Sequence, residues 1–151
     1  MLVTDDPIRV ADWVWPRTHG PEGFQDFQAV GVENQDGVLV AGMVFTGCTP
    51  NFNVEIHLAI DDPRAVGLSF YKYTFQYAFL VLNVKRVTAI CREGYKRNER
   101  LLKGMCFKKE GVARSGYLLK DGSLVDAGLY SCLRSECRLI PKEYRTMKDL
   151  N

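Results

Sequence analysis

A strand, a short break and a long helix follow one another between residues 53 and 82, and this junction constrains the fold most. Asn53–Ile60 alternates in the manner of a β-strand, and the Asp-Asp-Pro sequence that follows ends it. Leu68–Leu82 contains neither glycine nor proline and carries aromatic residues at helical spacing. The β-branched run Arg86–Cys91 comes next, so the segment predicts a β-α-β unit.

The remaining segments place this unit inside a mixed sheet. Two Asp-Gly pairs, each between β-rich runs, predict hairpins. The first joins Ala29–Asn34 to Val38–Phe45, and the second joins Phe107–Leu119 to Leu124–Leu133. Helical patterns cover Pro7–Trp15, capped by Asp5 or Asp6, and Tyr95–Met105. We therefore expect an α/β fold (an α+β mixed sheet) of about six to seven strands with helices on both faces.

Length and composition favour one globular domain. The chain has 151 residues, and we assign residues 1–140 to a single domain and residues 141–151 to a polar tail. The N-terminus lacks the pattern of a secretory signal, and the longest apolar run, Ala78–Val84, is too short for a membrane span. The five cysteines form no Cys-x-x-Cys pair, and His19 and His57 lie far from any cysteine pair. We expect reduced thiols in a cytoplasmic protein, with no metal site and no membrane partner.

Charge is distributed unevenly along the chain. Residues 1–62 hold ten acidic and two basic residues, whereas residues 63–151 hold eight acidic and eighteen basic residues. The segment 85–109 alone has nine basic and two acidic residues. One half would suit a polyanionic ligand and the other a cationic one, although solvated surfaces explain the same distribution. Nucleic-acid binding through segment 85–109 is a third interpretation, which ranks behind the others.

The break after the strand has the features of a phosphate-binding loop. A helix N-terminus presents free N–H groups and a partial positive charge. A glycine at position 67 would let the backbone approach a ligand closely, and Arg64 adds a fixed cation. The candidate residues for holding a pyrophosphate are Arg64, Ala65, Val66, Gly67, Leu68 and Ser69.

Two ionisable side chains lie on one face of the strand before this loop. Strand alternation places Glu55 and His57 on the same side as Ala59. A general base is one reason for such a pair, because an amine nucleophile must lose a proton before it attacks. A solvated strand face or a structural Glu–His pair are the alternatives.

The segment from Tyr95 to Arg114 resembles the GNAT superfamily of N-acetyltransferases. It is similar to the ribosomal-protein N-terminal acetyltransferase branch, and to small phage proteins, which read roughly N-x-x-[AS]-x-x-x-x-x-x-L-G-F-x-x-E-G-x-x-R. Phe107–Arg114 is the most specific part of the match. Arg64–Ser69 falls at the position of the family's acyl-CoA loop, [QR]-x-x-G-x-[GA]. The resemblance covers about residues 28 to 138.

The resemblance implies an enzyme that moves an acetyl group from acetyl-CoA directly to an amine. The acceptor would be a protein N-terminus, a lysine or a small amine, and the enzyme a monomer or homodimer. The cofactor would lie between two splayed parallel strands, with its thioester held by the backbone of Leu58, Ala59 and Ile60 and its pyrophosphate by the loop. Glu55 would act as general base, with His57 as the second candidate. Tyr95 and Asn98 would lie beside the pantetheine arm.

Several positions depart from the family pattern. The glycine of the family's L-G-F is Cys106, and the asparagine that contacts pantetheine falls on Tyr95, with Asn98 at the small-residue position. The tyrosine that many members use as general acid falls near Leu102, which leaves Tyr130 or water as candidates. These departures motivate an alternative hypothesis, a catalytically degraded module that binds acyl-CoA or a host protein without turnover.

Overall fold

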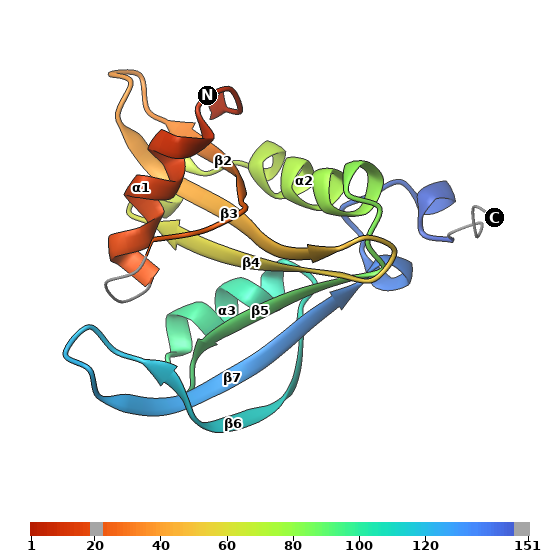
Figure 1. The fold of residues 1–151 in the computed structure, drawn as a ribbon. Coiled ribbons are helices and arrows are strands. Elements are labelled where there is room, and N and C mark those ends of the chain that lie inside the picture. The colour runs from red at the N-terminus through yellow and green to blue at the C-terminus, as the bar shows by residue number, and fades with distance from the viewer. Residues whose placement is uncertain (19–22, 147–151) are drawn as a thin grey trace.

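The computed structural model describes residues 1–18 and 23–146, which form a seven-stranded mixed sheet flanked by helices (Figure 1). The sheet order is β1-β2-β3-β4-β5-β7-β6. The strands are β1 (Leu2–Val3), β2 (Gln28–Glu33), β3 (Leu39–Thr49), β4 (Asn53–Ile60), β5 (Arg86–Arg92), β6 (Lys108–Leu118) and β7 (Leu124–Leu133). The helices are α1 (Pro7–Thr18), α2 (Leu68–Gln76) and α3 (Lys96–Gly104), with a π-helical turn at Tyr77–Val81 and short 3-10 turns at Pro63–Ala65, Arg134–Glu136 and Lys142–Tyr144.

Strands β4 and β5 are the parallel pair in this sheet, and every other neighbouring pair is antiparallel. Their connection contains α2, as a crossover between parallel strands requires. Their register runs from Asn53–Arg86 to Ile56–Ala89 and ends there, within the continuous stretch 23–146 that the structure describes. The last residues of both strands therefore diverge, and the sheet splits into a β1–β4 half and a β5–β7 half.

Helix α1 covers one face of the β1–β4 half, and it crosses β2, β3 and β4 in Figure 1. Val10 and Val14 are fully buried there against Val44 and Ala59. The approach is so close that a Cβ on Gly42 of β3 would lie 2.5 Å from Val14 Cγ2. Glycine at position 42 is thus required for α1 to lie at this distance from the sheet.

The opposite face carries the larger core. Phe70, Phe75 and Phe79, from α2 and the π-helical turn, are fully buried against the apolar side of β4 and β5. Leu102 brings α3 into the same cluster, and Phe107 packs its ring 5.7 Å from that of Phe75. The predicted mixed sheet with helices on both faces is therefore confirmed.

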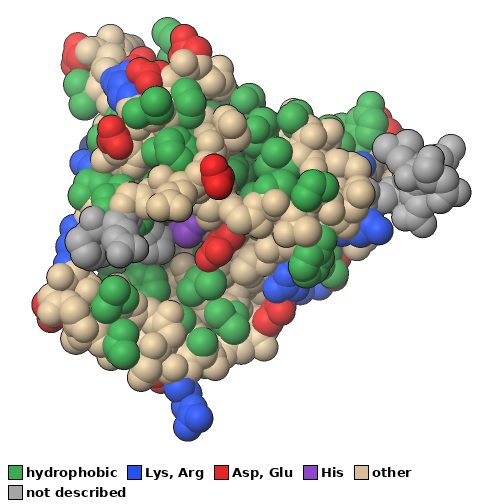
Figure 2. Space-filling view, viewed as in Figure 1, with side chains coloured by type: hydrophobic (Ala, Val, Ile, Leu, Met, Phe, Trp, Pro, Cys, Tyr) green, Lys and Arg blue, Asp and Glu red, His purple; other side chains and the backbone are tan. Residues whose placement is uncertain are grey.

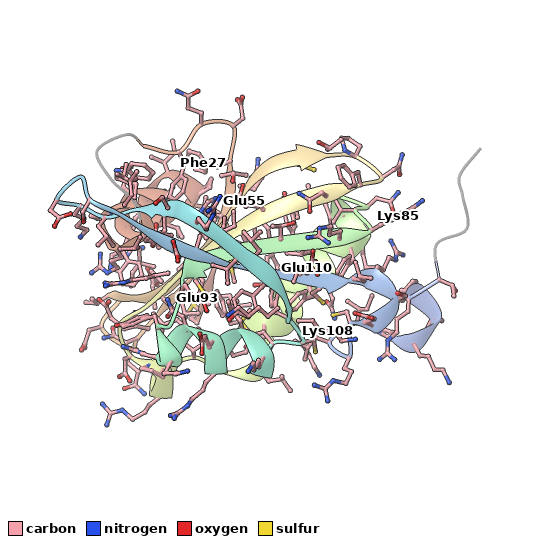
Figure 3. The ribbon with its side chains drawn as sticks, turned by 90° about the horizontal axis from the view of Figure 1, so that it is seen from below. Phe27, Glu55, Lys85, Glu93, Lys108 and Glu110 are labelled. Carbon is pink, nitrogen blue, oxygen red and sulfur yellow. The ribbon has the colours of Figure 1, made fainter. Side chains whose placement is uncertain are left out.

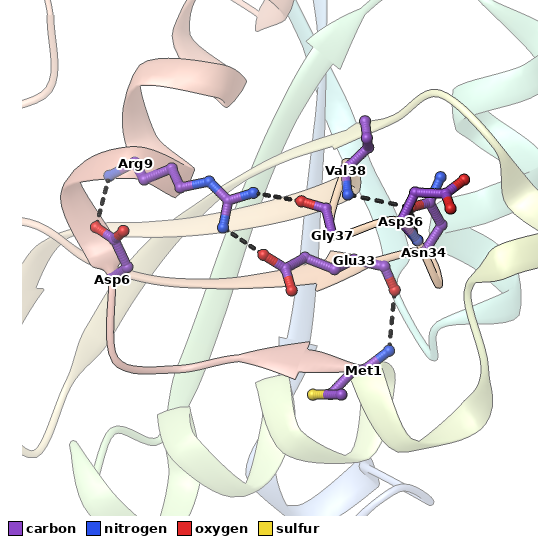
Figure 4. Close-up of polar contacts among 8 residues, drawn as sticks. All are labelled: Met1, Asp6, Arg9, Glu33, Asn34, Asp36, Gly37 and Val38. Atoms are coloured by element: carbon purple, nitrogen blue, oxygen red, sulfur yellow. Dashed lines mark hydrogen bonds and ion pairs between the residues drawn. The ribbon is translucent and has the colours of Figure 1, made fainter.

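The N-terminal part is fixed by a small polar network (Figure 4). Asp6 caps α1 by accepting a hydrogen bond from the Arg9 backbone N–H at 3.2 Å. The Arg9 guanidinium pairs with Glu33 and donates to the Gly37 carbonyl at 2.8 Å, so α1 is tied to the β2–β3 turn. Gly37 has a φ of +73°, which the predicted Asp-Gly turn requires.

A buried arginine attaches the end of the chain to the core. Arg134 follows β7 and donates to the Phe79 carbonyl at 2.6 Å and to the Tyr144 carbonyl at 2.5 Å. Burial lowers the pKa of its guanidinium. The first residues of the segment 141–151 are held by this arginine, while 147–151 lie outside the described residues.

Helix and strand positions agree with the sequence prediction within a few residues, with three differences. The predicted helix Leu68–Leu82 ends as α-helix at Gln76 and continues as a π-helical turn, in which Leu82 N–H donates to the Tyr77 carbonyl. The two-residue strand β1 was not predicted. Tyr95, the predicted first residue of a helix, is instead the N-cap of α3.

Candidate active site

A cavity of about 630 Å³ opens where β4 and β5 diverge. Beyond Ile56 and Ala89 the facing edges of the two strands have no strand partner among the described residues. Their backbone groups are therefore available to a ligand, except for the Ile60 carbonyl, which accepts a hydrogen bond from Arg97. The lining residues come from α1, β4, the turn after β4, α2, β5, α3 and β6. Leu58, Ala59 and Ile60, predicted to hold a thioester, all line this cavity.

The two candidate bases lie on the α1 side of β4, but only one of them lines the cavity. His57 is a lining residue, and its Nε2 is 2.7 Å from Thr46 Oγ1 on β3. The ring of Phe24 packs against the imidazole at a centroid distance of 4.9 Å. Figure 2 shows the histidine side chain set back in a depression of this face.

Glu55 lies two residues earlier on the same strand, roughly 7 Å along it, where β4 and β5 are still paired. Its cross-strand neighbours are Thr46 and Thr88, and Figure 3 shows it on the same side as Phe27. Burial raises the pKa of the Glu55 carboxyl above its ordinary value. A raised pKa brings a carboxylate nearer to the range in which a general base works well.

The predicted phosphate loop lies beside the cavity, and some of its backbone N–H groups already donate hydrogen bonds within the loop. Asp62 caps the 3-10 turn by accepting from the Arg64 N–H at 3.1 Å, and the hydrogen bonds from Arg64 hold the pKa of Asp62 below its usual value. The N–H groups of Ala65 and Val66 donate to carbonyls within the turn. Helix α2 starts after Gly67, and its first internal donor is Phe70. The N–H groups of residues 67 to 69 are thus the ones that point out of the helix start.

Helix α3 supplies the cationic wall of the cavity. Tyr95 and Asn98, both predicted beside the cofactor, line it, as do Arg97 and Arg100. Arg97 donates to the Ile60 carbonyl at 3.4 Å, so α3 lies next to the end of β4. Two guanidinium groups and a helix start at one end of the cavity suit an anionic ligand.

None of the residues of the predicted phosphate loop lines the cavity itself. Pro63 and Tyr71, on either side of the loop, do line it. The loop residues that lie outside the lining are Arg64, Ala65, Val66, Gly67, Leu68 and Ser69. Arg64 is largely exposed, with a side-chain exposure of 92%. The loop is therefore placed at the rim of the cavity.

Tyr117, Thr18 and Arg17 are among the lining residues that sequence reasoning missed. Tyr117 comes from β6, and its hydroxyl donates to the Thr18 carbonyl at the end of α1 with a distance of 2.9 Å. Arg17 lines the same region, stacks on Trp13 and pairs with Asp61 at 2.9 Å. No local sequence pattern connects residues 99 positions apart, so these contacts become visible only in the fold.

Among the described residues, no three histidine, cysteine or carboxylate side chains are grouped in a way that would hold a metal ion. All five cysteines are free thiols. No helix in the described ranges is long and apolar enough to cross a membrane.

The chain is similar to known proteins in its three-dimensional structure. No family model matches the sequence, and no curated protein matches it. A mutant of spermidine N-acetyltransferase from Vibrio cholerae superposes with a TM-score of 0.71 and 14% identity, covering 95% of this chain and 99% of that one. The same enzyme in complex with CoA and spermine gives 0.60 and 16%, covering 73% and 67%.

Other matches are partial. A chimera of the Vibrio cholerae enzyme has a TM-score of 0.60 and 17% identity over 71% of this chain, which spans 65% of the chimera's length. At these identities the similarity concerns the fold. The mixed seven-stranded sheet, the splayed parallel pair and the flanking helices are thus those of the GNAT acyl-CoA N-acyltransferase fold.

Proposed function

We propose that this chain is an acetyl-CoA-dependent N-acetyltransferase of the GNAT superfamily that transfers an acetyl group directly to an amine. The observation that carries the proposal is the end of pairing between β4 and β5 after Ile56 and Ala89, with a cavity of about 630 Å³ at that point. A cavity bordered by unpaired strand edges and a helix N-terminus fits an elongated, phosphorylated thioester.

On the donor side, the residues of α2 and α3 would bind the cofactor. The N–H groups at Gly67, Leu68 and Ser69 would hold the pyrophosphate, and Arg97 and Arg100 would contribute charge. The backbone of β4 would orient the thioester carbonyl and polarise it, because N–H groups aimed at a developing oxyanion stabilise it. Acetyl-CoA supplies the acyl group and a thiolate leaving group.

On the acceptor side, Glu55 and His57 would remove the proton of the attacking amine. The amine nitrogen forms a bond to the acetyl carbon, the carbon–sulfur bond breaks, and the thiolate takes up a proton. His57 lines the cavity, and the half-buried Glu55, next on the same face, would act through water. One structural neighbour is a spermidine N-acetyltransferase in complex with CoA and spermine, which supports a small amine as acceptor here.

Calorimetric titration with acetyl-CoA, on the wild type and on Gly67→Trp, tests the proposal. Gly67 has an extended backbone, and a Cβ there has its nearest contact at 3.9 Å, so a side chain can leave the backbone at this position without a clash. We expect micromolar binding by the wild type and none by Gly67→Trp. Gly104→Trp is the matched control, because its Cβ meets nothing within 4 Å and it lies at the far end of α3. A folded wild type that does not bind acetyl-CoA contradicts the proposal.

One observation favours the alternative, a module that binds acyl-CoA or a protein without turnover. The Asp62-capped turn engages the N–H groups of Arg64, Ala65 and Val66, which reduces the donors left for a pyrophosphate. The test uses the double variant Glu55→Gln, His57→Gln. The alternative is supported if this variant still binds acetyl-CoA and keeps its biological activity. Loss of acetyl transfer and of biological activity in the same variant would support the enzyme.

A further inference from the structure

We infer that Tyr117 is a specificity-determining residue that limits the acceptor to amines with an unbranched carbon next to nitrogen. The inference rests on the proposed function for the identity of the acceptor site. It begins with the hydrogen bond from the Tyr117 hydroxyl to the Thr18 carbonyl, 2.9 Å long and partly buried.

This hydrogen bond spans the split in the sheet. Thr18 ends α1, which packs on β2, β3 and β4, whereas Tyr117 belongs to β6, the outer strand of the other half. Tyr117, Thr18 and His57 all line the cavity. The bridge therefore crosses the cleft on the α1 side, where the candidate bases lie, and an acceptor bound beside His57 would share the cavity with it.

An irregularity in strand β6 determines where the Tyr117 side chain lies. Between the pairs Ala113–Ala127 and Tyr117–Val125, β6 advances four residues while β7 advances two, which is an enlarged β-bulge. The carboxylate of Asp126 holds the bulge by accepting from the Ser115 N–H at 2.9 Å. A Cβ at Gly116 would lie 2.7 Å from that of Ala113, so glycine is needed there. Bulges near active sites commonly redirect a side chain, and here the redirected side chain is Tyr117.

The hydroxyl is also suited to a lasting bridge. Burial raises the pKa of Tyr117, so the phenol is a protonated donor at neutral pH. The aromatic ring then forms a fixed wall rather than a mobile side chain. A fixed wall discriminates by shape, which for a single carbon branch amounts to about tenfold or more.

The test compares butan-1-amine with butan-2-amine, which have the same formula and charge and differ only in the branch beside nitrogen. Dissociation constants are measured by NMR titration for the protein alone and for the protein with CoA. The variants are Tyr117→Phe, Tyr117→Ala and, as control, Leu118→Ala, whose exposed side chain lies next in the strand. Acetyl transfer to each amine is followed in parallel.

We expect the wild type and Leu118→Ala to prefer butan-1-amine by about tenfold. Tyr117→Ala should lower this ratio below about threefold by improving butan-2-amine binding, and Tyr117→Phe should give an intermediate value. An unchanged ratio in Tyr117→Ala, proportional weakening of both amines, or no amine binding by the wild type overturns the inference. If the ratio of the two dissociation constants changes in Tyr117→Ala but no acetyl transfer is seen, the inference holds and the proposed function is refuted. If acetyl transfer is seen but the ratio is unchanged, the proposed function holds and the inference is refuted.

Discussion

Replacing Gly42 with alanine tests how closely α1 must lie on the sheet. The new Cβ would lie 2.5 Å from Val14 Cγ2 and 3.0 Å from Val10 Cγ1. Carbon atoms in contact prefer about 3.5 to 4.0 Å, so α1 has to retreat by about 1 Å. Both valines are fully buried and cannot rotate into solvent. Overpacking of this kind costs about 1–3 kcal/mol, and for a chain of this length each kcal/mol lowers Tm by about 2–4 °C.

Urea and thermal unfolding of Gly42→Ala measure this loss. Gly104→Ala is the matched control, because its Cβ meets no atom within 4 Å and it lies in a helix, so we expect no destabilisation. Adding Val14→Ala to Gly42→Ala should recover part of the loss, with a coupling energy of at least about 0.5 kcal/mol. A Gly42→Ala variant within about 0.5 kcal/mol of the wild type, or strictly additive losses in the double variant, would refute the close-packing argument.

Three further predictions concern charged groups. Glu55→Gln should lower acetyl transfer by about 10²–10⁴-fold. Because the folded-state pKa of Glu55 is raised, the stability it contributes is fully present below the unfolded pKa and is lost as pH rises through the folded value. The glutamine variant should therefore be the more stable protein near neutral pH, with the difference vanishing below about pH 4 in pH-dependent urea unfolding. Arg134→Met leaves the Phe79 and Tyr144 carbonyls without their donor and should cost roughly 2–5 kcal/mol in urea unfolding; a loss under about 1 kcal/mol contradicts its role as an anchor. Asp61→Asn removes an exposed ion pair and should change the unfolding free energy by under about 1 kcal/mol; a larger, salt-insensitive change would contradict this.

Local signals explain which parts of the fold could be predicted from the sequence. The Asp36-Gly37 and Asp121-Gly122 turns require positive φ at glycine, +73° and +85°, and this requirement can be read from the sequence. The alternation in β4 likewise predicts that Glu55 and His57 share one face, which the structure identifies as the side covered by α1. Both features depend on residues a few positions apart, so periodicity and turn chemistry are sufficient to predict them.

The missed features depend on contacts between distant residues. The length over which β4 and β5 pair is not encoded by either strand alone. The separation of the strands was therefore expected only from the family resemblance, and the lining of the cavity by Ile90 was not predicted. The bulge before Tyr117 interrupts a run that the sequence reads as one continuous strand. The 3-10 turn capped by Asp62 likewise changes which loop N–H groups are available. In each case tertiary packing selects among backbone conformations that the local sequence leaves open.

The acidic and basic parts of the chain form different halves of the folded sheet. Residues 1–62, with ten acidic and two basic residues, build α1 and strands β1 to β4. The residues after them, which are predominantly basic, build α2, α3 and strands β5 to β7. Because the chain crosses from one half of the sheet to the other just after β4, the change in charge falls at the cleft. Under the proposed function, an anionic cofactor beside α2 and α3 and a cationic amine on the α1 side would each meet a field of opposite sign, which favours their encounter where β4 and β5 separate.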